Sequence, residues 1–182
     1  MVLVAVCGVL AGWSDGVTGY LLVAAGAAFL DRISDLLIGR ETFRTEILAL
    51  VGASLLSGVG LILAGMARLG APWDGITALH LAFMGGLGLG VLAVFAIAGL
   101  MHTGRSLPVP RSVSVALALT VGAVGLRTLP ALGVIPWPPG PPHALAALLW
   151  SATFLIWLRA YWPYLSRPKL TEAEPNRIGD QR

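Results

Sequence analysis

The chain has 182 residues, of which 57% are hydrophobic and only 12% are charged, and its formal net charge is +3. Soluble domains carry about a quarter charged residues, and the mean hydropathy here is +0.83, so most of the chain is expected to lie in lipid. One cysteine, Cys7, excludes a disulfide framework. No basic face carries interleaved aromatic residues, which excludes nucleic-acid binding.

The first apolar segment, residues 2–12, is too short to cross a membrane. Eleven residues reach about 17 Å as a helix, against a hydrocarbon core of about 30 Å. The segment lacks a basic region and a cleavage site, so a signal peptide is not expected. We predict a short N-terminal apolar helix that ends at the Trp13–Gly16 break. The alternative is one long broken helix that continues to Leu30.

Five longer apolar runs follow, and each is predicted to span the membrane as a helix. Since a span needs about 20 apolar residues, a chain of 182 residues has room for about five or six. The predicted fold class is therefore all-α, a polytopic transmembrane bundle with five full spans in residues 1–165 and a polar, partly disordered tail in 166–182. The runs cover residues 17–30, 47–67, 76–101, 112–135 and 143–162.

Basic residues gather in alternate connections between these runs. Connection 31–46 holds three of them, connection 102–111 holds two, and the region from Arg159 to the end holds five; only Arg68 and Arg127 lie elsewhere. Basic loops are retained in the cytoplasm. We therefore expect an integral membrane protein with connections 31–46 and 102–111 and the C-terminus on the cytoplasmic side. Connections 68–75 and 133–142 are then outside.

Small residues recur in the middle runs, and Gly86 and Gly90 form a GxxxG pattern. Such residues let helix backbones approach closely where lipid supplies no hydrophobic drive. Besides the lipid bilayer, the glycine faces suggest three neighbours: other helices of the bundle, a cofactor, or a partner membrane protein, which includes a second copy of the chain.

The three histidines are His80, His102 and His143. His80 and His102 lie at opposite ends of one predicted helix, about 33 Å apart, so they cannot share a metal, and His102 is a separate candidate ligand. His80 and His143 both begin helices at the outer surface, and Met84 shares a helix face with His80. Imidazole and thioether groups suit haem or copper. The alternative is that these histidines are interfacial or capping residues.

Arg127 is the strongest single signal for a site, because it lies in an apolar run about seven residues from its outer end. Intramembrane arginines are costly and are usually paired inside the bundle. The expected partners are Asp15, Asp74 or a bound anion such as a haem propionate, which makes Arg127 a candidate cofactor-binding residue. The alternative is that Arg127 reaches the outer interface by snorkelling.

No nucleotide-binding, protease or hydrolase motif is present. No paired carboxylates lie within the predicted spans, so a proton relay is not supported. The segment Met101–Arg105 reads as a helix end, in which Gly104 suits the C-cap. The sequence therefore assigns the chain neither as an enzyme nor as a non-enzyme.

Three segments together resemble the NnrS family, polytopic bacterial membrane proteins with haem and copper that are linked to nitric-oxide metabolism. They are residues 78–107, which open with a histidine and close with His-Thr-Gly-Arg, residues 125–132 (GLRTLPAL), and the aromatic C-terminal stretch 148–169. Family members are about twice as long, so the chain resembles their C-terminal half. It departs from the pattern at Gly52, where a histidine is expected, and at Ile97, where an arginine is expected.

The resemblance implies an NnrS-like integral membrane protein that acts in nitric-oxide or nitrosative-stress tolerance and binds haem, with copper as the other candidate cofactor. The rival hypothesis is a structural or accessory subunit of a larger membrane complex that has no cofactor of its own. A third hypothesis is a half-size transporter that dimerises.

The charge pattern predicts the topology. A reporter protein that is active only in the cytoplasm should be active when it is fused to the C-terminus. The reason is that ten basic residues keep the inner connections and the C-terminal region on the cytoplasmic side. Activity of a periplasm-specific reporter at the same position would contradict this orientation.

Overall fold

The computed structural model describes residues 2–37 and 39–166, which form helices joined by short connections. The elements in chain order are α1 (Val2–Leu10), α2 (Asp15–Asp31), α3 (Ile33–Leu36), the 3₁₀ turn η1 (Arg40–Phe43), α4 (Thr45–Arg68), α5 (Gly75–His80), the π-helical segment η2 (Leu81–Leu87), α6 (Gly88–His102), α7 (Arg111–Thr128) and α8 (Ala144–Leu165). No strand occurs in these ranges, which confirms the all-α prediction. The predicted disordered tail lies almost wholly outside the described residues.

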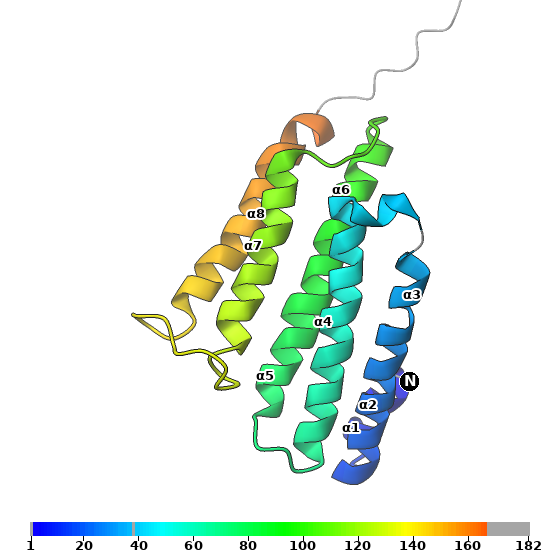
Figure 1. Cartoon of the computed structure of the whole chain (residues 1–182), viewed down its shortest axis with the longest axis vertical. Coiled ribbons are helices and arrows are strands. Elements are labelled where there is room, and N and C mark those ends of the chain that lie inside the picture. The colour runs from blue at the N-terminus through cyan, green and yellow to red at the C-terminus, as the bar shows by residue number, and fades with distance from the viewer. Residues whose placement is uncertain (1, 38, 167–182) are drawn as a thin grey trace, which may run out of the picture.

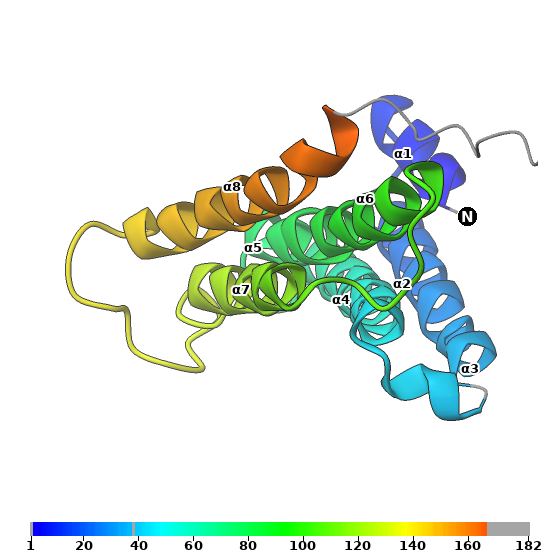
Figure 2. The same ribbon diagram turned by 90° about the horizontal axis from the view of Figure 1, so that it is seen from above.

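The long helices lie alongside one another with alternating directions (Figure 1). Seen from above, α4 and the continuous helix α5–η2–α6 are central, with α2 on one side and the α7–α8 pair on the other (Figure 2). Helices α3, α6 and α8 end, and α4 and α7 begin, at one end of the bundle. We call this the basic end, because Arg32, Arg44, Arg105 and Arg111 lie there. The other end is called the site end.

Four helices in the described part of the chain are long and apolar enough to cross a membrane. They are Asp15–Leu36, Thr45–Arg68, Gly75–His102 and Ala144–Leu165. The fifth predicted span corresponds to α7, which has 18 residues and ends at Thr128 instead of 135. Pro130 accounts for the early end, because it has no backbone N–H and cannot continue the hydrogen-bond ladder.

Short sequence signals set the other helix ends. Ser14 Oγ accepts a hydrogen bond from Val17 N at 3.4 Å and caps α2, and Asp74 caps α5 by accepting from Ile76 N at 3.1 Å. At the end of α6, Gly104 adopts a φ of 72°, which lets Arg105 N donate to Leu100 O at 2.9 Å. This bond satisfies a carbonyl that the helix end leaves free.

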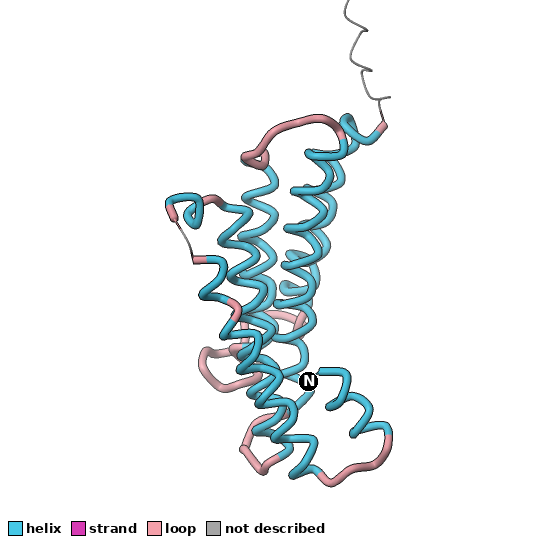
Figure 3. Tube along the Cα trace, turned by 90° about the vertical axis from the view of Figure 1, so that its right-hand side faces the viewer, coloured by secondary structure: helices cyan, strands magenta, loops and turns pink. Residues whose placement is uncertain are grey.

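Helix α1 is short, as predicted, and it does not continue into α2. Gly12 has a φ of 71° between them, and the chain reverses, so that α1 lies beside the part of α2 nearer the site end (Figure 3). Ala5 is fully buried there in a cluster with residues of α2, α4, α5 and η2. The alternative of one long helix to Leu30 is therefore wrong.

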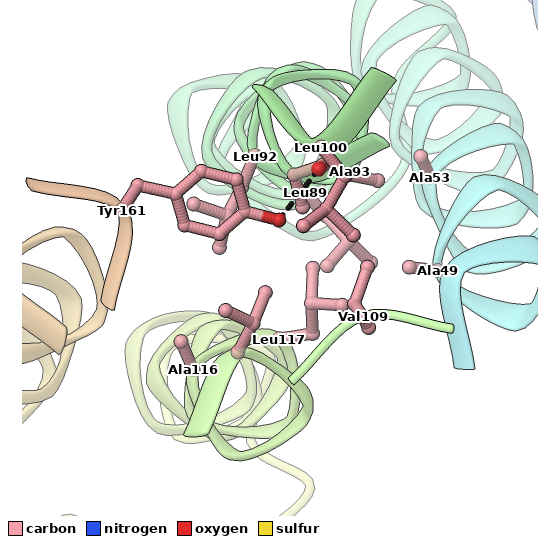
Figure 4. Packing of buried hydrophobic residues seen from close by; sticks show 12 residues of the cluster. Ala49, Ala53, Leu89, Leu92, Ala93, Leu100, Val109, Ala116, Leu117 and Tyr161 are labelled. Carbon is pink, nitrogen blue, oxygen red and sulfur yellow. Dashed lines mark hydrogen bonds between the residues drawn. The ribbon is translucent and has the colours of Figure 1, made fainter. Parts of the chain in front are cut away.

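A second cluster fills the half of the bundle nearer the basic end, between α4, α6, α7 and α8. Figure 4 shows Tyr161 reaching from α8 toward α6, where its hydroxyl donates to the carbonyl of Ala96. Large rings of α8 meet glycines of α6: Trp150 fills the space beside Gly88, and Tyr161 fills the space beside Gly99. Side chains of opposite size thus allow α8 to pack closely.

Glycines also bring α4 against both of its neighbours. A methyl group on Gly26 would lie 2.5 Å from the carbonyl oxygen of Gly58, and one on Gly60 would lie 2.8 Å from the Cα of Ala82. At Gly86 it would lie 2.7 Å from the backbone nitrogen of Ser57. These crossings lie within one chain, so of the three expected neighbours the glycine faces mainly meet other helices of the bundle.

The two glycines of the GxxxG pattern differ in their surroundings. A methyl group on Gly90 would lie 3.4 Å from the Cβ of Ala53, an ordinary contact. Gly86→Ala should therefore lower the free energy of unfolding by about 1–3 kcal/mol, because backbone atoms of Ser57 cannot yield. Gly90→Ala should leave it unchanged or raise it, because alanine favours helix. Thermal unfolding in detergent measures both; equal loss in the two variants would contradict the crossing.

Candidate functional site

Three polar side chains from separate elements meet at the site end of the bundle. His80 is the last residue of α5, Arg127 lies in the last turn of α7, and His143 directly precedes α8. The antiparallel course of α7 between α6 and α8 brings these positions to the same end (Figure 1). His80 and His143 therefore lie at one end of the bundle, as the sequence predicts.

The partners of His80 determine its tautomer. Its Nδ1 lies 2.8 Å from the carbonyl oxygen of Ile76, and because a carbonyl only accepts, Nδ1 carries the proton. Nε2 then holds the free lone pair. Arg127 Nη2 lies 3.4 Å from this Nε2 and donates to it. His80 is thus a neutral imidazole whose lone pair is directed at a guanidinium.

Arg127 lies nearer to the end of its helix than the sequence indicated. Since α7 ends at Thr128, Arg127 is not seven residues inside a span but in the final turn, where the helix dipole favours a cation. The two carboxylates expected as its partners are engaged elsewhere: Asp15 pairs with Arg68 at 2.8 Å, and Asp74 caps α5. Within residues 2–37 and 39–166, no ion pair joins a carboxylate to Arg127.

His143 has an unusual backbone and an unusual environment. Its φ is 69°, a left-handed conformation that few non-glycine residues adopt and that is enriched at functional sites. Its ring packs edge-on against Trp137 with centroids 4.9 Å apart. Its Nδ1 is buried, and no hydrogen-bond partner for it exists in the described part of the chain.

The electrostatic surroundings keep His143 neutral. Burial lowers the pKa of His143 below its ordinary value of 6.5, and the nearby Arg127 and His80 lower it further. A second neutral imidazole therefore lies within the electrostatic influence of the first one and of the guanidinium. Neutral imidazole is the form that binds metals, and guanidinium is the side chain that best matches carboxylates and phosphates.

The other two predicted ligands are not brought into this cluster by any hydrogen bond or ring contact. Met84 is partly buried in η2, one turn beyond His80, and its role as a ligand stays a prediction. His102 is exposed at the opposite end of the same helix, so it cannot join His80. Among the described residues, no group of three or more His, Cys, Asp or Glu side chains could hold a metal ion.

Two features of the site were not predicted from the sequence. The π-helical segment η2 begins directly after His80, and such segments are frequent at functional sites. Trp137 lies against His143, although the sequence indicated only a rigid turn there. The glycine-rich GGLG stretch at 85–88 is the one visible signal for irregular helix.

The family model described as "NnrS protein" matches residues 1–169. No curated protein and no solved structure matches the chain.

The lowered pKa of His143 predicts a pH dependence of stability. Well above pH 6.5 the residue is neutral in both states and has no effect. As the pH falls below 6.5, the unfolded chain takes up the proton first, so the free energy of unfolding falls until the folded pKa is passed. Thermal unfolding in detergent between about pH 8 and pH 5 should show this loss. His143→Gln should reduce it, whereas the control His102→Gln should not.

Proposed function

Because the chain belongs to the NnrS family, we propose that it is a membrane protein of nitric-oxide and nitrosative-stress tolerance that binds haem at the site end. The observation that carries the proposal is the meeting of two neutral imidazoles with a guanidinium that no described carboxylate pairs with. The link to nitric oxide rests on the family resemblance, and the binding site rests on the geometry.

The residues present fit a haem group. The Nε2 lone pair of His80 and the unpartnered, buried Nδ1 of His143 are imidazole nitrogens of the kind that ligate haem iron. Arg127 would bind a propionate through its guanidinium. Bound haem would supply an iron centre that can take a small diatomic gas in place of one of the two imidazoles, while the protein residues would hold and orient the group.

Copper is the second candidate cofactor. Imidazole and thioether sulfur are both copper ligands, so His80, His143 and Met84 are the residues that would bind it. This assignment needs Met84 to turn toward the imidazoles, whereas haem needs only the histidines and Arg127. The geometry therefore favours haem.

The proposed orientation of the chain in the membrane rests on the basic residues that gather at one end of the bundle. We place the basic end in the cytoplasm of a bacterium, with the C-terminus inside, and the His80–Arg127–His143 cluster at the outer face of the inner membrane. Arg68 and Arg127, the two bases at the outer end, each have a local reason to lie there. Arg68 pairs with Asp15, and Arg127 contacts His80.

The rival hypothesis of an accessory subunit loses much of its motive. Its argument was the glycine faces, and Gly26, Gly58, Gly60, Gly65 and Gly86 are used in crossings inside the chain. A docking surface for a partner would need glycines that remain open on the outside. Gly16 on α2 and Gly122 on α7 have open space beside them, but they lie on separate helices and do not make one packing face.

Absorption spectroscopy of the purified protein tests the proposal. Wild-type protein and the control His102→Ala should show a Soret band. The variants His80→Ala and His143→Ala should lose or shift it, because each removes an imidazole ligand. Thermal unfolding of each variant separates loss of haem from loss of fold. A colourless, folded wild-type protein that co-purifies with other subunits, even when haem is supplied, would favour the accessory subunit.

A further inference from the structure

Arg127 is partly buried, whereas Arg32, Arg111 and Arg159 are exposed. Arg68 has the carboxylate of Asp15 at 2.8 Å, and Arg44 has that of Glu46 at 2.8 Å. Arg105 lies 3.9 Å from the centroid of the Tyr164 ring. In the described chain the hydrogen-bond partner of Arg127 is a neutral imidazole, so its positive charge is not compensated by a carboxylate.

The hydrogen bond to His80 is also a weak one for the guanidinium of Arg127. Its length, 3.4 Å, exceeds the usual range of about 2.7–3.2 Å for hydrogen bonds from N–H groups. A guanidinium has five N–H donors arranged to grip two oxygens at once. The contact engages one of them, through Nη2. A carboxylate or phosphate would form shorter, charge-assisted bonds and would therefore displace the imidazole.

His143 supplies a second polar group that lacks a partner at the same place. Its Nδ1 is buried and makes no hydrogen bond to the described residues, and a buried polar atom left unsatisfied costs about 1–3 kcal/mol. His143 directly precedes α8, Arg127 lies in the last turn of α7, and these two helices pack along each other (Figure 1). An oxyanion that reached both groups would accept from the guanidinium and from a protonated Nδ1 of His143, in which case His80, and not Nδ1 of His143, is the nitrogen left for a metal.

We propose that Arg127 and His143 form a binding site for an oxyanion, either a carboxylate or a phosphate, and that His80 holds the guanidinium only until the anion binds. Anion binding would then release the Nε2 lone pair of His80. The anion site stands by itself, whereas its link to metal binding rests on the function proposed above. By thermodynamic linkage, an anion that frees His80 favours a metal at His80, and the metal favours the anion equally.

Thermal unfolding in a non-ionic detergent tests the anion site. Acetate or inorganic phosphate, replacing chloride at constant ionic strength, should raise the melting temperature saturably in wild-type protein. The response should persist in Arg68→Gln, the matched control, because Arg68 lies at the same end but already has Asp15. It should disappear in Arg127→Gln. An equal response in Arg127→Gln, or none in wild-type protein, would overturn the proposal.

A second measurement uses wild-type protein only, so it does not depend on whether Arg127→Gln folds. In protein labelled with ¹⁵N-histidine, saturating acetate should shift the Nε2 resonance of His80, because this atom loses the guanidinium donor. The resonances of His102, which is exposed at the basic end, should stay in place and serve as the control. Unchanged His80 resonances at saturating acetate would contradict the release of its lone pair.

Nanodiscs distinguish the two sources of the anion. If phosphatidylglycerol in a phosphatidylcholine bilayer abolishes the acetate response, a lipid phosphate occupies the same site; if the response persists, the ligand is diffusible.

The linkage between anion binding and metal binding is tested with Zn²⁺ as the probe. Its affinity should rise about fivefold or more with saturating acetate in wild-type protein and should not rise in Arg127→Gln. If acetate raises the melting temperature but the purified protein shows no Soret band, the anion site stands and the proposed haem function is refuted.

Discussion

Helix α4 lies between α2 and the Gly75–His102 helix only because glycine replaces a larger side chain where the backbones cross. Gly58 and Gly65 face α2, and Gly60 faces Ala82 on the other side. In lipid, where apolar burial gives little drive for association, such backbone proximity and van der Waals contact hold helices together. These crossings fix the position of α5 and η2 along the axis of α4. His80 lies at the junction between α5 and η2. The position of the site thus depends on contacts in the middle of the bundle.

The fold class could be predicted from the sequence, because composition, the length of the apolar runs and the basic connections all indicate helices that cross a membrane. It was less informative about helix ends. The apolar run 112–135 continues past Pro130, and apolarity alone cannot tell a helix from an apolar turn. Pro130 was the signal that the run stops being helical. Correcting that end moves Arg127 from the interior of a span to its final turn.

The site was predictable as a set of residues but not as a set of contacts. That His80 and His143 lie at one end follows from helix direction alone. The contact between Arg127 and His80 joins residues 47 positions apart, and it depends on the rotation of α5 and α7 about their axes. No pattern within either run specifies that rotation. The same limit applies to the GxxxG pattern, which does not reveal that Gly86 lies at a backbone crossing and Gly90 does not.

The π-helical segment has a consequence for how His80 is aimed. Hydrogen bonds in η2 skip one residue more than in an α-helix, so the segment contains a surplus residue relative to a uniform helix from Gly75 to His102. Each residue of an α-helix turns the chain by about 100°. The surplus therefore sets the angular phase between α5 and α6. A chain shortened by one residue in η2 could keep α6 packed as it is, yet it would point the imidazole of His80 away from Arg127. The two ends of one continuous helix are in this way oriented independently.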